Sequence, residues 1–385
     1  MKKYSINDIL AKSNQTVYIL SRYACKDSEA IRKESDQNIN FRTPYAIDRD
    51  RILYSGAYRR YHGKTQVFSF TNMIDEEMTN RNLHTTYVSQ ISRTISKILG
   101  LNLELVEAIA LGHDLGHTPF GHDGERSLSR MCRKYGIGDF HHNIESLHII
   151  DNISRNGDGL NLTLQVRDGI ISHDGESDNS ILRPNRNKTE KDILDYIIRR
   201  TSNTEEKIEM MPMTLEGCVV RISDTIAYIG QDIEDAVRYN FLKREELPKD
   251  CESYLGNTNS KIVDNLVKSA ILNSFEEDYI CFDEETAYYL TKLKKFNYER
   301  IYQDKRVKSA NPKIDKCMEM LFEKYISDIE HQNKQSKIYK QFLNNKKDKY
   351  IQSFSTIEKV RDFIATMTDR YFNEEVKDYI LPWEK

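Results

Sequence analysis

The sequence predicts an all-α protein, with a helical core and an additional helical region packed on it. Apolar residues recur at intervals of three and four along most of the chain, which is the spacing of a buried helix face. Runs in which Val or Thr alternate with polar residues, as in half-buried strands, are few. No segment of twenty to fifty residues repeats, which argues against a solenoid. We place the core in residues 1–240 and the C-terminal helical extension in residues 241–385, together forming one structural unit.

Composition narrows the class of protein further. The chain has 385 residues, of which 30% are charged, and no run approaches the roughly 18 apolar residues that span a bilayer. Its net charge of -3, from 57 basic and 60 acidic residues, gives no general attraction to nucleic acid or anionic lipid. The six cysteines have no paired spacing and the N-terminus MKKYSINDIL lacks an export signal. We expect a cytoplasmic protein without membrane contact.

The first helix of interest is RNLHTTYVSQISRTISKIL, residues 81–99. Val88, Ile91 and Ile95 follow His84 at helical spacing, so they form one apolar stripe with the histidine at its end. We therefore expect the His84 imidazole to point into the protein.

A second helix delivers an adjacent histidine and aspartate to the same interior. In LELVEAIALGHDLGH the apolar stripe runs through Ile109 into His113 and Asp114, and Gly116 and Pro119 then end the helix. The His-Asp pair is thus expected where a buried helix stops.

A third helix, TLEGCVVRISDTIAYIGQDIEDAV, carries two stripes. The apolar one consists of Leu215, Val219, Ile222, Ile226, Ile229 and Ile233. The polar one, Asp224, Tyr228 and Asp232, recurs at every fourth residue. Carboxylates placed between apolar residues are costly to bury unless a cation or ligand meets them.

Together the three helices offer two imidazoles and several carboxylates. His84, His113, Asp114 and Asp224 are a ligand set for a hard or borderline divalent ion, with positions left for water and substrate oxygens. The alternative is that these histidines are hydrogen-bonded core residues, as lone histidines on helix stripes often are. The loop HDLGHTPFGHDGE favours chemistry, because it adds His117, His122 and Glu125 within one short segment. His122 and Glu125 are three residues apart where a helix should begin, so the carboxylate can orient the imidazole.

The motif order H…HD…D and the segment HDLGHTPFGHDGE resemble the HD superfamily of metal-dependent phosphohydrolases, and within it the deoxyguanosine triphosphate triphosphohydrolase family. Further matching segments are DRDRILYSGAYRRYHGKTQVF, RNLH, HHNIES, SDTIAYIGQDIEDA and IATMTDRY, which extend the resemblance over about residues 40 to 372. The resemblance implies an HD-domain core that binds one divalent metal ion per site, chosen among Mn, Mg, Fe, Ni and Zn.

The resemblance also implies roles for particular residues. The implied metal ligands are His84, His113, Asp114 and Asp224, and the implied catalytic group is His122 with its partner Glu125, beside His117 and His142 on the triphosphate side. The implied substrate contacts are Arg81 for phosphate, Gln66 and Asp232 for the sugar 3′-hydroxyl, and Tyr228 against the deoxyribose. The chain departs from the family in having TNRNLHTT where RTRLTHS is common, so fewer basic residues meet phosphate there.

The substrate residues have simpler interpretations as well. Gln66 could close a turn, and Tyr228 could be a core aromatic residue. Arg81 could pair with Glu76 or Glu77 at little energetic consequence. We interpret His141 and His148 as structural. The lysine- and tyrosine-rich C-terminal part is predicted to form solvated helices, with contact to single-stranded nucleic acid as the alternative.

The implied activity is hydrolysis of a deoxynucleoside triphosphate to deoxynucleoside and inorganic triphosphate. Two competing functions stay open at this point. One is another HD-type nucleotidase or phosphodiesterase, in which His142 or a neighbour holds a second ion. The other is a non-catalytic protein that binds nucleotide or single-stranded DNA. The resemblance further implies a homo-oligomer and activation by a second nucleotide.

Overall fold

The computed structural model describes residues 18–36, 41–67, 79–175, 181–202 and 208–381. Within these ranges the regular structure is helical, and extended pairing is confined to two isolated bridges, Thr65 with Asn80 and Leu182 with Ile280. The predicted all-α fold is confirmed. None of the described helices is long and apolar enough to cross a membrane.

The helices fall into an N-terminal and a C-terminal series. The first is α2 (Pro44–Leu53), α3 (Gly56–Arg60), α4 (Arg81–Leu99), α5 (Leu103–Gly112), α6 (Gly121–Lys134), α7 (His142–His148), α8 (Ser154–Gly157), α9 (Leu164–Ile171), α10 (Glu190–Thr201) and α11 (Leu215–Arg238). The second is α12 (Lys249–Leu255), α13 (Asn259–Ser274), α14 (Glu284–Asn297), α15 (Asn311–Glu330), α16 (Asp348–Ser353), α17 (Thr356–Ala365) and α18 (Asp369–Ile380). Single short turns are η1 (Asp27–Glu29), η2 (Tyr61–Gly63), η3 (Ile149–Ile153), η4 (Arg244–Glu246), η5 (Tyr298–Tyr302), η6 (Val307–Ala310), η7 (Ile338–Phe342) and η8 (Leu343–Asn345).

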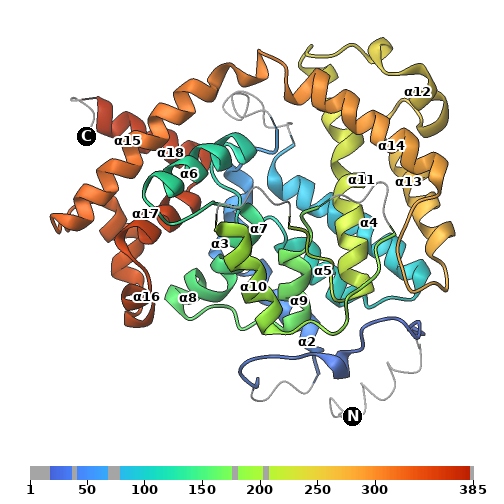
Figure 1. Cartoon of the computed structure of the whole chain (residues 1–385), viewed down its shortest axis with the longest axis horizontal. Helices are drawn as coiled ribbons and strands as arrows, with labels where there is room; N and C mark the ends of the chain where they lie inside the picture. The colour runs from blue at the N-terminus through green and yellow to red at the C-terminus, as the bar shows by residue number, and fades with distance from the viewer. Residues whose placement is uncertain (1–17, 37–40, 68–78, 176–180, 203–207, 382–385) are drawn as a thin grey trace, which may run out of the picture.

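The three helices singled out in the sequence pack against one another. α4 contacts both α5 and α11, and α9 also contacts α5 and α11 (Figure 1). The apolar stripe of α11 is buried along its whole length, from Leu215 to Ile233. Burial of such a stripe supplies most of a helix's stability in a globular protein, so it fixes which way the polar stripe faces.

Local signals set where these helices begin and end. Asn80 caps α4 by accepting a hydrogen bond from the backbone of Leu83 at 3.0 Å, and Asn102 caps α5 in the same way. Thr214 accepts from Gly217 at the start of α11. Gly100 ends α4 in the left-handed conformation, with φ of 70°. The stop of α5 at Gly112 leaves His113 and Asp114 at the beginning of the following loop.

The C-terminal helices pack on the N-terminal series at two separate places. α13 and α14 pack on α11, whereas α15 packs on α6 and α17, and Figure 1 shows these two groups at opposite ends of the molecule. Buried apolar residues from Ala24 to Phe372 form one continuous cluster. The C-terminal region is therefore a helical extension packed on the core, while a domain boundary near residue 240 stays a prediction.

Candidate metal centre and active site

The structure brings the four predicted metal ligands together. His84 lies in the first turn of α4, His113 and Asp114 follow α5, and Asp224 lies in the middle of α11. Nε2 of His84 is 2.9 Å from Oδ1 of Asp224 and 3.9 Å from Oδ2 of Asp114. Nε2 of His113 is 3.4 Å from the same Asp114 oxygen and 3.9 Å from the Asp224 oxygen. Atoms bound to one ion at about 2.0–2.2 Å have such separations.

His113 provides a direct test of whether the cluster fits a metal ion. Its Nδ1 atom is 2.6 Å from the carbonyl of Ala110, so the proton is on this nitrogen. Its Nε2 atom is buried and has no hydrogen-bond partner among the described residues. With its proton on Nδ1, the imidazole directs the buried Nε2 atom at two carboxylates, and this nitrogen and oxygen donor set suits a divalent ion.

Both carboxylates of the cluster are held in the ionised form. Burial raises the pKa of Asp224, but the hydrogen bond and charge of His84 outweigh burial and lower this pKa to about 2. Burial also raises the pKa of Asp114. The neighbouring His113, His117 and Arg81 outweigh burial and keep this pKa well below the usual range. The cluster thus offers negative charge to a cation.

The sequence analysis missed one histidine of this group, His173. Nε2 of His173 lies 3.8 Å from Oδ1 of Asp114, and its ring is 4.9 Å from that of His113. Its Nδ1 bonds to the carbonyl of Ile170, three residues earlier, as His113 bonds to Ala110. The signal that could have found it is a second His-Asp pair after a buried helix, His173 with Asp174 after α9.

A chain of hydrogen bonds links this cluster to His122. Oε2 of Glu125 is 2.9 Å from Nδ1 of His122, and Oε1 accepts from Nδ1 of His142 at 3.0 Å. The backbone N–H of His142 also donates to Oε1, at 2.8 Å. Nε2 of His142 lies 3.3 Å from Nε2 of His173. Glu125 therefore orients two imidazoles at once.

The protonation of His142 follows from these partners. Nε2 of His173 is an acceptor, because the proton of His173 lies on Nδ1, so His142 must donate to it. His142 also donates to Glu125 and is therefore an imidazolium. Burial opposes this charge, yet the Glu125 carboxylate outweighs burial and raises the pKa of His142 to about 9. The ring of His117 stacks on His142 at 4.1 Å, and its Nε2 is 3.1 Å from Oδ1 of Asp114.

The loop that carries these histidines is fixed by the C-terminal region. Phe120, with a left-handed φ of 65°, donates its backbone N–H to Oδ1 of Asp369 at 2.9 Å. The other oxygen of Asp369 accepts from the backbone and the hydroxyl of Thr65. Lys64 donates to the carbonyls of His117 and Ala365. Asp369 belongs to the segment IATMTDRY, so that segment has a structural partner at the site.

Glycine is required at one point of this loop by close packing. A Cβ atom on Gly116 would lie 2.2 Å from the carbonyl oxygen of His142 and from the backbone nitrogen of Ser146. The backbone N–H of Gly116 donates to the hydroxyl of Ser146 at 2.8 Å. The loop therefore lies directly on α7, which places His117 against His142.

A cavity of about 540 Å³ opens beside the cluster, and ten of the twelve predicted site residues line it. His113 and Glu125 are the exceptions, although each contacts residues that line the cavity. The side chain of His122 is 64% exposed at its rim, whereas Gln66 contributes a buried Oε1 atom without a hydrogen-bond partner in the described chain. The predicted residues thus share one cavity of the size that small ligands occupy.

Arg81 is a buried residue in the lining of this cavity. Its Nη1 donates to Oδ2 of Asp114 at 2.6 Å. Its Nε and Nη2 atoms have no hydrogen-bond partner among the described residues. The alternative partners Glu76 and Glu77 lie outside the residues that the structure describes. Arg81 therefore faces the cluster with two donors left for a ligand.

The polar stripe of α11 extends from the cluster along the cavity wall. Asp224, Tyr228 and Asp232 all line it, and burial raises the pKa of Tyr228 to about 12. Asp232 accepts a hydrogen bond of 2.5 Å from Tyr302, a residue that the sequence analysis did not single out. Burial raises the pKa of Asp232 to about 8, with the Asp235 and Asp224 charges adding to it and the Tyr302 hydrogen bond opposing it.

Basic groups reach the cavity from several parts of the fold. Although TNRNLHTT has fewer basic residues than the family pattern, other segments supply Arg126, Arg200, Arg221, Lys294 and Lys308. The number of cations near the site therefore could not be judged from this segment alone.

Comparison with known proteins agrees with this geometry. Residues 83–229 match the HD domain, and residues 280–378 match the phosphohydrolase-associated domain. A deoxyguanosinetriphosphate triphosphohydrolase-like protein of Caldanaerobacter subterraneus subsp. tengcongensis is 36% identical, over 94% of this chain and 93% of its own length. Proteins of the same name from Desulfatibacillum aliphaticivorans and Clostridium tetani are 33% and 34% identical, over 91% and 89% of this chain and 92% and 86% of theirs. All four clustered residues lie in the HD match.

Proposed function

This chain belongs to the deoxyguanosinetriphosphate triphosphohydrolase-like family of HD-domain phosphohydrolases, and we propose that it hydrolyses a deoxynucleoside triphosphate to deoxynucleoside and inorganic triphosphate. The observation that carries the proposal is that one cavity is lined both by residues of the His/Asp cluster and by His122, whose Nδ1 atom bonds to Glu125. Water would attack the α-phosphorus, and the bond between this phosphorus and the 5′-oxygen would break.

We assign His84, His113, Asp114 and Asp224 to one divalent ion. When bound, such an ion supplies positive charge that offsets the negative charge developing on the phosphate. The chain's own part in the site is to hold two carboxylates ionised and two imidazole nitrogens directed at the same point. The nitrogen and oxygen donors admit Mn, Mg, Fe, Ni or Zn.

His122 is the proposed general acid. The 5′-oxygen is a poor leaving group unless it receives a proton. Among the histidines that line the cavity, His122 has the most exposed side chain. Glu125 holds its Nδ1, so Nε2 faces the cavity for proton transfer. His142 and His117 keep Glu125 and the loop in place and contribute to the triphosphate side.

The remaining cavity residues are proposed to bind the nucleotide. Arg81 has two free donors for phosphate oxygens, which a guanidinium recognises well. Tyr228 would lie against the deoxyribose, with Gln66 and Asp232 at the 3′-hydroxyl. A helical turn rises about 5.4 Å, close to the step from phosphate to sugar, so the order Asp224, Tyr228, Asp232 suits this arrangement.

Product analysis tests the reaction. The purified chain is incubated with each of the four dNTPs in the presence of each candidate metal, and the phosphorus-containing products are separated. Inorganic triphosphate with free deoxynucleoside is the expected result. Release of pyrophosphate or monophosphate would contradict attack at the α-phosphorus with loss of the intact triphosphate.

A second candidate function rests on one further observation. His117, His122, Glu125 and His142 form another group whose atoms lie close enough together to hold an ion. An HD-type nucleotidase or phosphodiesterase with two ions would use it. We prefer the single-ion assignment, because both nitrogens of His142 donate hydrogen bonds and leave no lone pair for an ion.

The cellular compartment and the oligomeric state of the protein are also proposals. All six cysteines are free thiols, which fits a reducing compartment, and we propose a cytoplasmic protein. A homo-oligomer and an activating nucleotide are further proposals from the family resemblance, and size measurement in solution with and without nucleotide tests both.

A further inference from the structure

Lys64 is a buried lysine without a carboxylate partner. It follows the turn η2 directly, and its residue is only 2% exposed. It forms no ion pair with the residues that the structure describes, and its Nζ atom donates instead to two backbone carbonyls, those of His117 and Ala365. Burying an ammonium group is costly unless a charged partner compensates for the lost water. Lysine at this position therefore lowers the stability of the fold unless it has another use.

The two acceptors belong to segments that are far apart in the chain. His117 lies 53 positions after Lys64, in the loop between α5 and α6 (residues 113–120, the active-site loop). Ala365 lies 301 positions after Lys64 and is the last residue of α17, with a distance of 2.9 Å between its carbonyl oxygen and Nζ. The last carbonyls of a helix carry partial negative charge, which attracts a cation. One ammonium group thus connects the active-site loop to the C-terminal region.

The main chain of Lys64 is fixed as well. Its carbonyl accepts a hydrogen bond of 3.2 Å from the backbone N–H of Arg81, at the start of α4. A Cβ atom on Gly63 would lie 2.8 Å from the side chain of Thr368, so the backbone before Lys64 lies directly on the segment before α18. Lys64 is therefore a fixed point from which its side chain can hold the loop.

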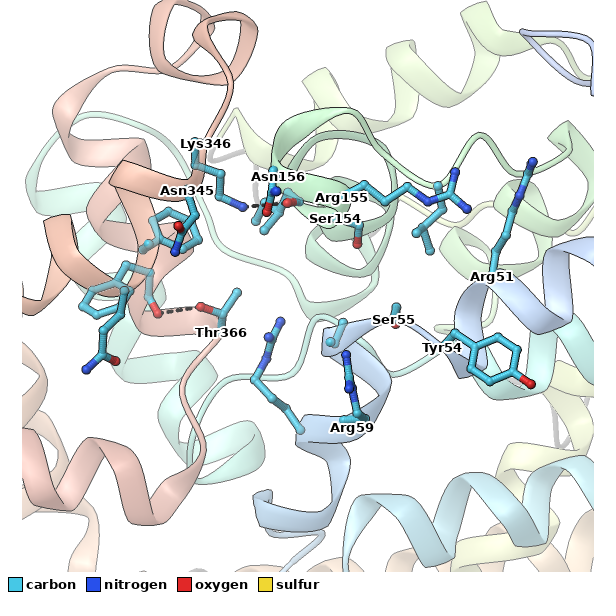
Figure 2. Close-up of a pocket in the computed structure, with 18 of the residues that line it drawn as sticks. Arg51, Tyr54, Ser55, Arg59, Ser154, Arg155, Asn156, Asn345, Lys346 and Thr366 are labelled. Atoms are coloured by element: carbon cyan, nitrogen blue, oxygen red, sulfur yellow. Dashed lines mark hydrogen bonds between the residues drawn. The ribbon is translucent and has the colours of Figure 1, made fainter.

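The end of α17 borders empty space. Thr366, which follows Ala365, lines a cavity of about 930 Å³ together with Met367 and Thr368. Figure 2 shows Thr366 in the wall of this cavity, with Arg59 of α3 also in the wall. A cavity supplies no packing contacts to the residues that line it. The position of this segment therefore depends strongly on its polar bonds, of which the bond to Lys64 is one.

His117 transmits the position of the loop to the site. Its backbone carbonyl accepts from Lys64, whereas its imidazole stacks on His142 at 4.1 Å and lies 3.1 Å from Oδ1 of Asp114. The centre of its ring is 5.0 Å from that of His122. A shift of the His117 backbone would therefore carry the imidazole away from these partners.

We propose that Lys64 is a positioning residue of the active site, whose ammonium group holds the active-site loop against the end of α17. This inference rests on the proposed function, in which the loop carries His117 and leads into His122. Lys64 is not among the residues that line the cavity of about 540 Å³, so it acts through His117 and not on the substrate. Hydrogen bonds from a charged donor are roughly twice as strong as those from a neutral one. The loop is therefore held best while Lys64 keeps its proton.

The surroundings of Lys64 bring the loss of this proton into the neutral range. Burial lowers the pKa of Lys64 from its ordinary value of 10.5 to about 7. Arg60 and Arg81 act in the same direction, whereas Asp369 and Glu145 oppose it. These four residues belong to α3, α4, α18 and α7. Because a lysine is charged below its pKa, the loop should be held below a pH of about 7 and loosened above it.

Glu145 titrates in the same range. Burial raises its pKa to about 7, with Arg361 opposing. Arg361 lies 3.7 Å from Glu145 and 2.7 Å from Asp362, so the charges of α17 in this region are paired. In the loop itself, burial keeps the pKa of His117 well below the usual range, so this imidazole stays neutral. An ionised Glu145 favours the ammonium form of Lys64, and Glu145→Gln should therefore move the loosening of the loop to lower pH.

Amide hydrogen exchange of the full chain with its metal reads the loop without reference to catalysis. The wild type is compared with Lys64→Met, which keeps the length of the side chain but removes both hydrogen bonds. The control is Lys268→Met, at an exposed lysine of α13. At a pH of about 6 we expect the amides of residues 115–120 to exchange at least about tenfold faster in Lys64→Met than in the other two proteins, with the amides of α5 unchanged.

The same measurement on the wild type between about pH 5.5 and about pH 9 needs no variant to fold. After correction for the intrinsic exchange rate, protection of the loop should fall about fivefold as the pH rises through about 7, because a neutral amine donates more weakly than an ammonium group. Protection of α5 should persist over this range. In Glu145→Gln the fall should occur at lower pH.

Turnover provides the second readout. For a nucleotide that the wild type hydrolyses, Lys64→Met should lower kcat at least about tenfold, with little change in KM or metal content, because Lys64 does not touch the substrate. A wild type that hydrolyses no dNTP contradicts the proposed function and leaves the exchange test of the loop in force. The inference is overturned if the loop of Lys64→Met exchanges as in the wild type, if α5 loosens together with the loop, if wild-type loop protection is independent of pH, or if Lys64→Met retains kcat.

Discussion

His142 and His173 share a hydrogen bond between their Nε2 atoms, which lie 3.3 Å apart. Because Ile170 accepts the proton on Nδ1 of His173, the shared proton belongs to His142. Both ring nitrogens of His142 therefore donate hydrogen bonds, one to His173 and one to Glu125. His142 links the His/Asp cluster to His122 through these bonds, but it has no free lone pair with which to bind an ion.

One metal ion per chain is the first prediction. Asp224→Ala should abolish binding of this ion, because it removes one carboxylate of two, while the helices remain folded by circular dichroism. His142→Ala should keep one equivalent. Elemental analysis of both variants and of Asp264→Ala, an exposed acidic residue of α13, gives the comparison. Two equivalents in the wild type, with one lost in His142→Ala, would instead establish a second ion.

His122→Ala should lower kcat on the order of a hundredfold or more, with metal content and nucleotide affinity retained. The proposed proton transfer occurs only in the transition state, so ground-state binding should not depend on it. His331→Ala, at an exposed histidine of the C-terminal region, is the control for loss of an imidazole. Near-normal turnover by His122→Ala would remove the residue from the acid role.

Tyr228 should discriminate between deoxyribose and ribose. A 2′-hydroxyl pressed against the buried ring would lose its hydrogen bonds to water at a cost of about 1–3 kcal/mol, a factor of roughly five to a hundred and fifty. Tyr228→Ala should therefore narrow the gap in kcat/KM between dGTP and GTP without abolishing hydrolysis.

Asp232→Ala completes this test from the 3′ side. It should weaken use of dGTP and affect 2′,3′-dideoxy-GTP much less, because that nucleotide lacks the hydroxyl that Asp232 is proposed to hold. Equal kcat/KM for GTP and dGTP in the wild type would show that this face of α11 does not read the sugar.

Asp369→Asn should slow the reaction without removing the metal. The amide can replace only one of the two carboxylate oxygens that hold Phe120 and Thr65, and a hydrogen bond to a charged group contributes about 1.5–3 kcal/mol. We expect kcat to fall tenfold or more, with a smaller change in KM. Asp378→Asn, on the same helix but exposed and paired with Lys337, should leave kcat unchanged. A fall in kcat that is matched by loss of metal would point to general unfolding instead.

Glu216 should make stability depend on pH. It is buried under the N-terminal segment, where it accepts from the backbone of Cys25 and Asn102, and burial raises its pKa to about 7. A raised carboxyl pKa favours the protonated form on folding, so its contribution is largest below the unfolded pKa of about 4.3 and is lost as pH rises to 7. Glu216→Gln should thus gain stability over wild type at pH 8, by up to about 3 kcal/mol, and little at pH 4.5. Urea denaturation at both pH values measures this, with exposed Glu245→Gln as control.

Much of the site could be predicted because apolar stripes determine which way a helix faces. The buried residues Val88, Ile91 and Ile95 turn His84 inward, and the stripe of α11 leaves Asp224 on the opposite, polar face. The cluster of four residues follows once these helices pack. Such reasoning is local, since it depends on spacing within one element.

The residues that were missed are those whose role depends on distant neighbours. α9 is buried on all sides, so no stripe singles out His173. Tyr302 lies in a region with many tyrosines, and no spacing shows which of them meets Asp232. Arg81 was predicted to contact phosphate, with Glu76 or Glu77 as the alternative partners, but its pairing with Asp114 in the fold could not be predicted from local spacing.

The bond between Asp369 and Phe120 joins residues that are 249 positions apart in the chain. The ribosome adds the proposed metal ligands and His122 long before it adds Asp369, and a growing chain folds from its N-terminus. During that interval the loop lacks the anchor that fixes Phe120. A nascent chain therefore contains every residue assigned to the chemistry before it contains the anchor of the loop. We expect the loop to reach the arrangement described here only after residue 369 has been added.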